Sequence, residues 1–88
     1  MNTQNTYNGW RNYETWRIAL EYFDSYNPFE YETDISDLAK LLSEYVCEHL
    51  EMDCNNQTTL SYAMSFIEAV DWYEIAENMI KENNYENQ

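Results

Sequence analysis

The feature that most constrains the fold is a run of apolar side chains at helical spacing within residues 35–50. These residues lie three or four positions apart, so a helix would gather them into one apolar stripe: Ile35, Leu38, Leu41, Leu42, Tyr45, Val46 and Leu50. Asp34 stands just before the run and can cap a helix N-terminus. The pattern predicts an amphipathic helix from Ile35 to about Glu51, which must bury its stripe against other elements.

An earlier helix is predicted from Tyr13 to about Ser25, with Asn12 as its N-cap. Its inward face is expected to carry Trp16, Leu20 and Phe23, which recur at helical spacing. The Asn27-Pro28 pair ends it, because the residue before a proline disfavours the helical conformation. Residues 29–33 alternate aromatic and acidic side chains, a pattern that fits a short strand or extended segment as well as a loop; we interpret it as a linker.

The last third of the chain predicts two more helices. One begins near Thr58 or Thr59, after a turn at residues 53–57. The other runs from Trp72 to Glu82 behind Asp71, which with Glu74 resembles a capping box, while Val70 and Ile75 occupy the positions of a hydrophobic staple. Their inward faces are Leu60, Ala63, Met64, Ile67 and Val70 in the first, and Trp72, Ile75, Ala76, Met79 and Ile80 in the second.

These elements predict a mainly α fold, a small bundle of about four short helices with at most one short strand or extended segment near residues 29–33. A single glycine and a single proline leave few tight hairpin turns, which argues against a β-sandwich. Residues 1–88 are expected to form one domain. The polar ends, residues 1–9 and 83–88, are expected to fray.

The charge of the chain restricts its partners. Seventeen Asp and Glu against four Lys and Arg give a formal net charge of −13. No direct binding to nucleic acid is expected, because phosphate contacts need clustered basic side chains. No apolar run reaches the roughly 18 to 20 residues that a membrane span needs, so no membrane contact is expected. We expect a cytoplasmic protein whose partners are basic proteins.

Few residues suggest catalysis. His49 is the single histidine, and no glycine-rich phosphate loop or nucleophile motif is present. Cys47, His49, Asp53 and Cys54 are of the types that bind zinc, but on a helix Cys47 and His49 point about 200° apart. We therefore expect no catalytic residue, no metal site and no cofactor, and two reduced cysteines.

The acidic residues have an informative distribution. Four of them lead into the central predicted helix, and three more recur on its polar face about 5 to 6 Å apart, close to the separation of successive phosphates along a nucleic-acid strand. The predicted contact surface comprises Glu30, Glu32, Asp34, Asp37, Glu44, Glu48 and Glu51. They could instead be the ordinary solvated faces of an acidic protein. Trp10, Tyr26 and Tyr31 are candidate aromatic contacts, or they could close the ends of the domain or a dimer interface.

Two segments carry a resemblance to a known group of proteins. YNGWRNYETW at residues 7–16 and VDWYEIAENMI at residues 70–80 resemble small proteins of bacteriophages, plasmids and their hosts. These proteins open with N-G-W-x-N-Y-E-T-W, close with D-W-x-E-I-A, and are largely of unknown function. The matching residues are Asn8, Gly9, Trp10, Asn12, Tyr13, Glu14, Thr15 and Trp16, then Asp71, Trp72, Glu74, Ile75 and Ala76. The resemblance implies a mobile-element context and paired first and last helices, and it implies no reaction.

The chain is also similar, as a class, to small acidic anti-CRISPR and anti-restriction inhibitors. The leading hypothesis is a phage- or plasmid-encoded inhibitor of a host defence nuclease, acting by nucleic-acid mimicry on a basic groove of the nuclease or CRISPR effector. The alternative is a non-catalytic structural or regulatory interaction domain, as a monomer or a homodimer. The analogy favours the inhibitor beyond what the charge alone supports, and it is an analogy of class rather than of site.

Overall fold

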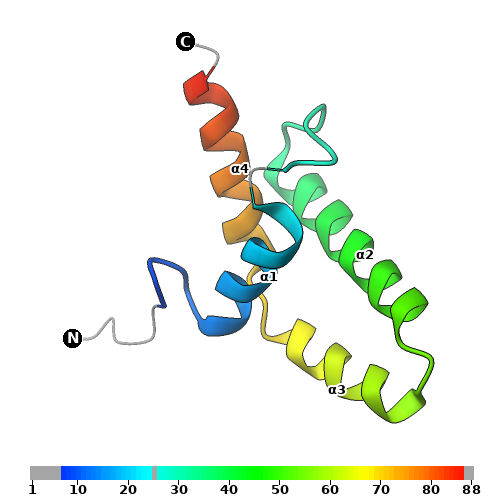
Figure 1. Cartoon of the computed structure of the whole chain (residues 1–88). Coiled ribbons are helices and arrows are strands. Elements are labelled where there is room, and N and C mark those ends of the chain that lie inside the picture. The colour runs from blue at the N-terminus through cyan, green and yellow to red at the C-terminus, as the bar shows by residue number, and fades with distance from the viewer. Residues whose placement is uncertain (1–6, 25, 87–88) are drawn as a thin grey trace.

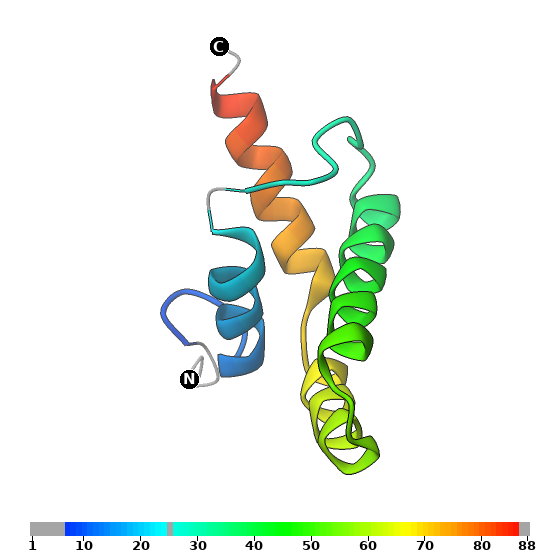
Figure 2. The ribbon, with the colours of Figure 1, turned by 45° about the vertical axis from the view of Figure 1, so that its right-hand side comes forward.

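The computed structural model describes residues 7–24 and 26–86 (Figure 1). This part of the chain forms four α-helices: α1 (Tyr13–Phe23), α2 (Ile35–Asp53), α3 (Gln57–Glu68) and α4 (Trp72–Glu86). Helix α4 lies between α1 and α2 (Figure 2). Helix α3 extends from the far end of α2 back to the start of α4 (Figure 1). The mainly α fold predicted from the periodicity is confirmed.

The first two helices begin at the predicted caps. The Asn12 side chain accepts a hydrogen bond from the Thr15 backbone N–H at 2.9 Å. The Asp34 carboxylate accepts one from the Asp37 N–H at 3.0 Å. Each bond satisfies a backbone donor that has no partner within the helix. Asp37 also lies in the first turn of α2, where the helix dipole favours a negative charge.

The other boundaries differ from prediction by a few residues. α3 begins at Gln57, because Asn56 in the predicted turn acts as its N-cap and accepts hydrogen bonds from the N–H groups of Thr58 and Thr59. α2 continues to Asp53 and α4 to Glu86, beyond the predicted ends at residues 51 and 82. That the chain ends fray stays a prediction, and residues 1–6 and 87–88 lie outside the described ranges.

Helix α1 ends at Phe23, and the predicted end, Ser25, lies outside the described residues. The backbone of Asp24 is extended, with ψ of 107°. The chain then passes through Asn27-Pro28 and crosses from the end of α1 to the start of α2 (Figure 2). The helix therefore ends before the pre-proline residue, as the steric rule requires.

The crossing segment is a loop with a turn, so its interpretation as a linker is correct. The Asn27 carboxamide accepts a hydrogen bond from the Phe29 N–H at 2.9 Å, and the Phe29 carbonyl accepts one from the Glu32 N–H at 2.9 Å. These bonds turn the chain where a strand would have to continue straight. No strand forms near residues 29–33; among the described residues, β pairing is confined to an isolated bridge between Tyr7 and Trp10.

The core lies mainly between α2 and α4. Leu38, Leu42 and Val46 of the predicted stripe are fully buried, and they share one cluster with Ile75 and Ala76 of α4. Ile35, Tyr45 and Leu50 of the predicted stripe pack against this cluster, whereas Leu41 is half-buried outside it. The stripe on α2 is therefore confirmed except at Leu41.

The inward face of α1 was predicted only in part. Phe23 is buried as expected, but Leu20 is 46% exposed and Trp16 is half-buried. The buried positions near the start of α1 are Thr15 and Ile18 instead. A polar residue therefore fixes the rotation of this helix, which apolar periodicity could not have indicated.

Candidate functional site

The chain enters α1 through a tight turn. Tyr7 and Trp10 exchange two backbone hydrogen bonds, of 2.6 and 2.8 Å. Between them, Asn8 and Gly9 both have positive φ, 49° and 87°. Two successive left-handed residues define a type I′ turn, for which Asn-Gly is the preferred pair. Gly9 therefore takes part in a tight turn just before α1.

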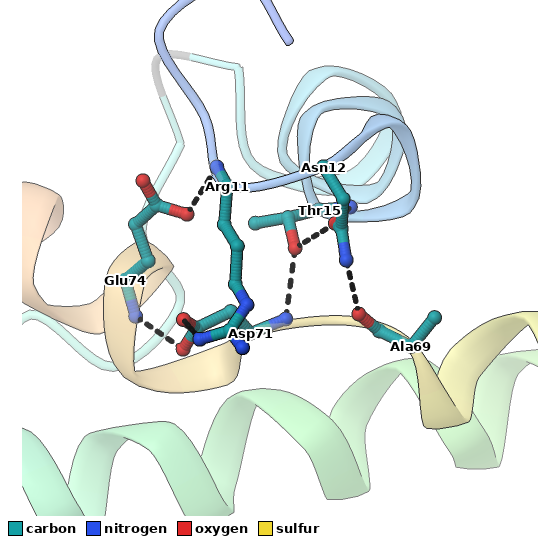
Figure 3. A network of polar contacts seen from close by, with 6 residues as sticks. All are labelled: Arg11, Asn12, Thr15, Ala69, Asp71 and Glu74. Atoms are coloured by element: carbon teal, nitrogen blue, oxygen red, sulfur yellow. Dashed lines mark hydrogen bonds and ion pairs between the residues drawn. The ribbon is translucent and has the colours of Figure 1, made fainter. Parts of the chain in front are cut away.

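A polar network ties this N-terminal segment to the start of α4 (Figure 3). Thr15 is fully buried, its hydroxyl donates to the Asn12 side-chain oxygen at 2.6 Å, and it accepts from the Asp71 N–H at 2.8 Å. The Asn12 amide group donates to the Ala69 carbonyl at 2.8 Å. Buried polar groups bonded in this way hold α1 in one orientation against α4.

The predicted capping box at the start of α4 forms by half. The Asp71 carboxylate accepts from the Glu74 N–H at 3.1 Å, as a cap should. Glu74 does not return the bond to Asp71; its carboxylate accepts from the Arg11 backbone N–H at 2.9 Å (Figure 3). Thr15 accepts the Asp71 N–H in its place. The two segments with the family resemblance are therefore in direct contact, and their polar residues have structural roles.

Four of the seven predicted carboxylates line up along the outside of α2. Successive residues of a helix are rotated by about 100°, so positions separated by seven, four and three fall within a sector of about 60°. These are Asp37, Glu44, Glu48 and Glu51, all of them exposed. We call them the acidic stripe. It extends about 21 Å along the helix, opposite the buried row of Leu38, Leu42 and Val46.

The other three predicted carboxylates lie on the loop before α2 and have different surroundings. Glu32 is half-buried and accepts a hydrogen bond from the Asp34 N–H at 3.1 Å. Asp34 is the N-cap of α2. Glu30 is exposed in the turn. The structure therefore gives two of these acids local roles in the loop and leaves Glu30 free of a described hydrogen bond.

No ion pair among the described residues neutralises the acidic stripe. The three pairs present join Arg11 to Asp71, Arg17 to Glu21 and Lys81 to Glu77. Lys40 lies on α2 between Asp37 and Glu44 in sequence, yet it is within ion-pair distance of no described carboxylate. The stripe thus presents its negative charge to solvent.

Two glutamates of the acidic stripe also affect the half-buried Cys47. Burial raises the pKa of its thiol, and the neighbouring Glu51 and Glu44 raise it further. A raised pKa keeps the thiol protonated at neutral pH, and the thiolate is the nucleophilic form. Cys47 is therefore a poor nucleophile.

The three candidate aromatic contacts lie in two places. Tyr26 and Tyr31 are exposed on the linker, by 54% and 73%, on the same loop as Glu30. Trp10 is half-buried and lines a groove between α1 and α4. Tyr26 and Tyr31 therefore share the loop between α1 and α2 with Glu30, whereas Trp10 lies on a different surface.

His49 belongs to an aromatic cluster centred on Tyr45 of α2. Its ring lies 4.3 Å from that of Tyr45 between centroids, and its Nδ1 is 2.8 Å from the Tyr45 carbonyl oxygen. The ring of Phe29 packs against that of Tyr45, with 5.8 Å between the ring centroids.

Over residues 7–24 and 26–86, no three His, Cys, Asp or Glu side chains are grouped to hold a metal ion. In the same part of the chain, no helix is long and apolar enough to cross a membrane.

The chain belongs to a protein family of unknown function, DUF7249, whose model matches residues 3–87. No curated protein and no solved structure matches it. The match covers the acidic stripe, the linker and both segments of the polar network, so all of these lie within the family domain.

Proposed function

We propose that this protein is a phage- or plasmid-encoded inhibitor of a host defence nuclease, of the anti-CRISPR or anti-restriction kind. It acts in the cytoplasm of the host cell, without catalysis, by placing its acidic stripe in a basic groove that otherwise holds nucleic acid. The mobile-element origin rests on the resemblance of residues 7–16 and 70–80. The mode of action rests on the arrangement of charge on α2.

The observation that supports the mimicry most is the unneutralised row of Asp37, Glu44, Glu48 and Glu51 on one exposed side of α2. Like charges three or four residues apart, as in Glu44, Glu48 and Glu51, destabilise a helix by a few tenths of a kcal/mol per pair. Glu48 has such neighbours on both sides, four residues before and three residues after. A helix that keeps this arrangement sacrifices some stability, which is accounted for if the row binds a basic surface.

The linker supplies further candidate contacts at the start of α2. Glu30 and the exposed rings of Tyr26 and Tyr31 lie just before α2 in the chain. Aromatic side chains bury a large area at low entropic cost and are enriched at interface hot spots. The proposed contact therefore combines long-range attraction from the stripe with short-range packing by the two tyrosines.

The alternative function, a structural or regulatory interaction domain, is favoured by a different observation. Several large apolar side chains are exposed away from the stripe, among them Leu20 and Tyr62. Such a domain would bind its partner or a second copy through apolar surface, and its charge would serve only to prevent aggregation.

A phage-plating assay separates these functions. A restriction-sensitive or CRISPR-targeted phage is plated on a defended host that expresses the parent chain, or a stripe variant with Glu44, Glu48 and Glu51 changed to Lys. The matched control changes Glu21, Glu68 and Glu77 to Lys, which alters the net charge equally but lies off the stripe. The proposal predicts that the parent and the control restore plating and that the stripe variant does not. Equal protection by both variants, or no protection by the parent against a panel of such defences, would refute it.

A further inference from the structure

A groove lies between α1 and α4, next to the polar network that joins their first turns. The network joins the first turns of the two helices, through Thr15 and Asp71. Beyond it, the groove runs toward the ends of the helices, from Trp16 to Asp24 on one side and from Ile75 to Glu82 on the other. The two walls are therefore held at a fixed relative orientation, and a cavity lies between them.

The groove has an apolar floor and an exposed apolar edge. Phe23, Ile75 and Met79 lie at its base and are buried, while Leu20 is 46% exposed on its wall. The cavity volume is about 210 Å³. Small-molecule sites usually have roughly 300 to 1,000 Å³, so this groove suits one or two protruding side chains rather than a cofactor.

The mouth of the groove is acidic. Asp24 is the C-cap of α1, and Glu82 lies near the end of α4. Both side chains are exposed, and neither forms an ion pair with a described residue. A bound apolar side chain would therefore be flanked by two unpaired carboxylates. An occupant that carries Lys or Arg beside its apolar anchors matches this rim.

We propose that the groove between α1 and α4 is a second docking site, which binds a cationic amphipathic helix of a partner protein. Grooves between two helices commonly receive a third helix, whose apolar side chains at positions i, i+3, i+4 and i+7 enter as anchors. The occupant's apolar side chains lie over Phe23 and Met79, and its basic side chains reach Asp24 and Glu82. This site does not depend on the acidic stripe, which lies on the outside of α2.

A second copy of the chain is the less suitable occupant. Each copy carries a net charge of −13, and its four Lys and Arg are dispersed over three helices and the segment before α1. None of the four helices has a basic residue in its last turn. Docking one copy into the acidic mouth of another would place like charges together.

The test uses a model peptide of about 18 residues made only of Leu and Lys, with Leu at the anchor spacing. Binding is followed by the indole N–H signals of the chain in NMR spectra. Trp10 and Trp16 line the groove, whereas Trp72 lines a depression between α2 and α4 and serves as an internal reference. We expect the Trp10 and Trp16 signals to shift and that of Trp72 to stay. A peptide of equal composition with its Leu residues scrambled should cause no such shift.

Leu20→Lys tests the wall, because it removes apolar surface and repels a cationic helix from an exposed position that tolerates lysine. We expect binding weaker by about tenfold or more, a change typical of losing one interface anchor. Tyr62→Lys adds the same charge on α3, outside the groove, and should leave the Trp10 and Trp16 shifts intact. The pair Asp24→Asn and Glu82→Gln should weaken binding more than the pair Asp53→Asn and Glu68→Gln.

Three results would overturn the inference. The first is equal binding of the Leu-Lys peptide by Leu20→Lys and the parent. The second is a Trp72 shift as large as those of Trp10 and Trp16. The third is a concentration-dependent shift of Trp10 and Trp16 in the chain alone, with dimers seen by sedimentation, which would assign the groove to a second copy. The stripe variant should keep its groove signals, so the failure of either site is seen separately.

Discussion

Thr15→Val should destabilise the protein far more than its near-identical shape suggests. The substitution keeps the volume of the side chain and removes its hydroxyl. That hydroxyl donates to Asn12 at 2.6 Å and accepts from the Asp71 N–H at 2.8 Å, at a position with no solvent exposure. The valine would leave the Asp71 N–H without its acceptor in a partly buried place.

The magnitude follows from these two bonds. Each contributes about 0.5 to 1.5 kcal/mol net, and an unsatisfied buried donor adds a penalty of about 1 to 3 kcal/mol. Because the Asp71 site is only partly buried, we expect a total loss of about 2 to 4 kcal/mol in the free energy of unfolding. Domains of this size lose about 4 to 8 °C of Tm per kcal/mol, so the Tm should fall by about 8 to 32 °C.

Urea denaturation followed by circular dichroism measures the effect. Thr15→Ser keeps the hydroxyl and loses one methyl group, which should cost only about 1 kcal/mol. Thr59→Val alters an exposed threonine of α3 and should stay within about 0.5 kcal/mol of the parent. A Thr15→Val protein as stable as Thr15→Ser would refute the role assigned to the network.

Three further predictions concern the turn and the stripe. Gly9→Ala should cost about 1 kcal/mol in a urea titration, because its φ of 87° strains any residue with a Cβ although the space around it is open; no loss would contradict the type I′ turn. Glu48→Gln should stabilise the fold at low salt by about 0.2 to 0.5 kcal/mol per like-charge pair removed, and the gain should vanish in high salt; a loss at low salt would show that Glu48 makes a favourable contact. Changing Glu44 and Glu51 to Gln should lower the raised pKa of Cys47, so that iodoacetamide alkylates it faster near pH 8 in a chain whose other cysteine is serine; an unchanged rate would show that the stripe does not act on this thiol.

Most of the fold could be predicted because apolar spacing and capping residues determine helices locally. The stripe on α2 and the caps Asn12 and Asp34 are visible in the sequence, since each depends on neighbours within four residues. The rotation of α1 was predicted only in part. It depends on Thr15 and Asp71, which are far apart in the chain and meet only after folding.

The candidate site was predictable to a similar degree. Exposure of Glu44, Glu48 and Glu51 follows from their place opposite the apolar stripe on one helix. Half-burial of Glu32 was not predicted, because the alternation over residues 29–33 fits a strand as well as a loop. The groove beside Leu20 was not predicted either, since its two walls belong to α1 and α4, at opposite ends of the chain.

The central claim is that the acidic stripe occupies the place of nucleic acid, and one competition measurement tests it most directly. The chain is immobilised and loaded with the host nuclease or effector. Duplex DNA or RNA is then added at about 0.1 M and at about 0.5 M salt. Between these concentrations the Debye length falls from about 10 Å to about 4 Å. The account predicts that nucleic acid displaces the retained protein at low salt and that high salt alone weakens retention. The stripe variant with Glu44, Glu48 and Glu51 changed to Lys should retain no nuclease or effector. The control with Glu21, Glu68 and Glu77 changed to Lys should retain it. Retention that resists both nucleic acid and salt, or that survives in the stripe variant with its helicity intact, would contradict it.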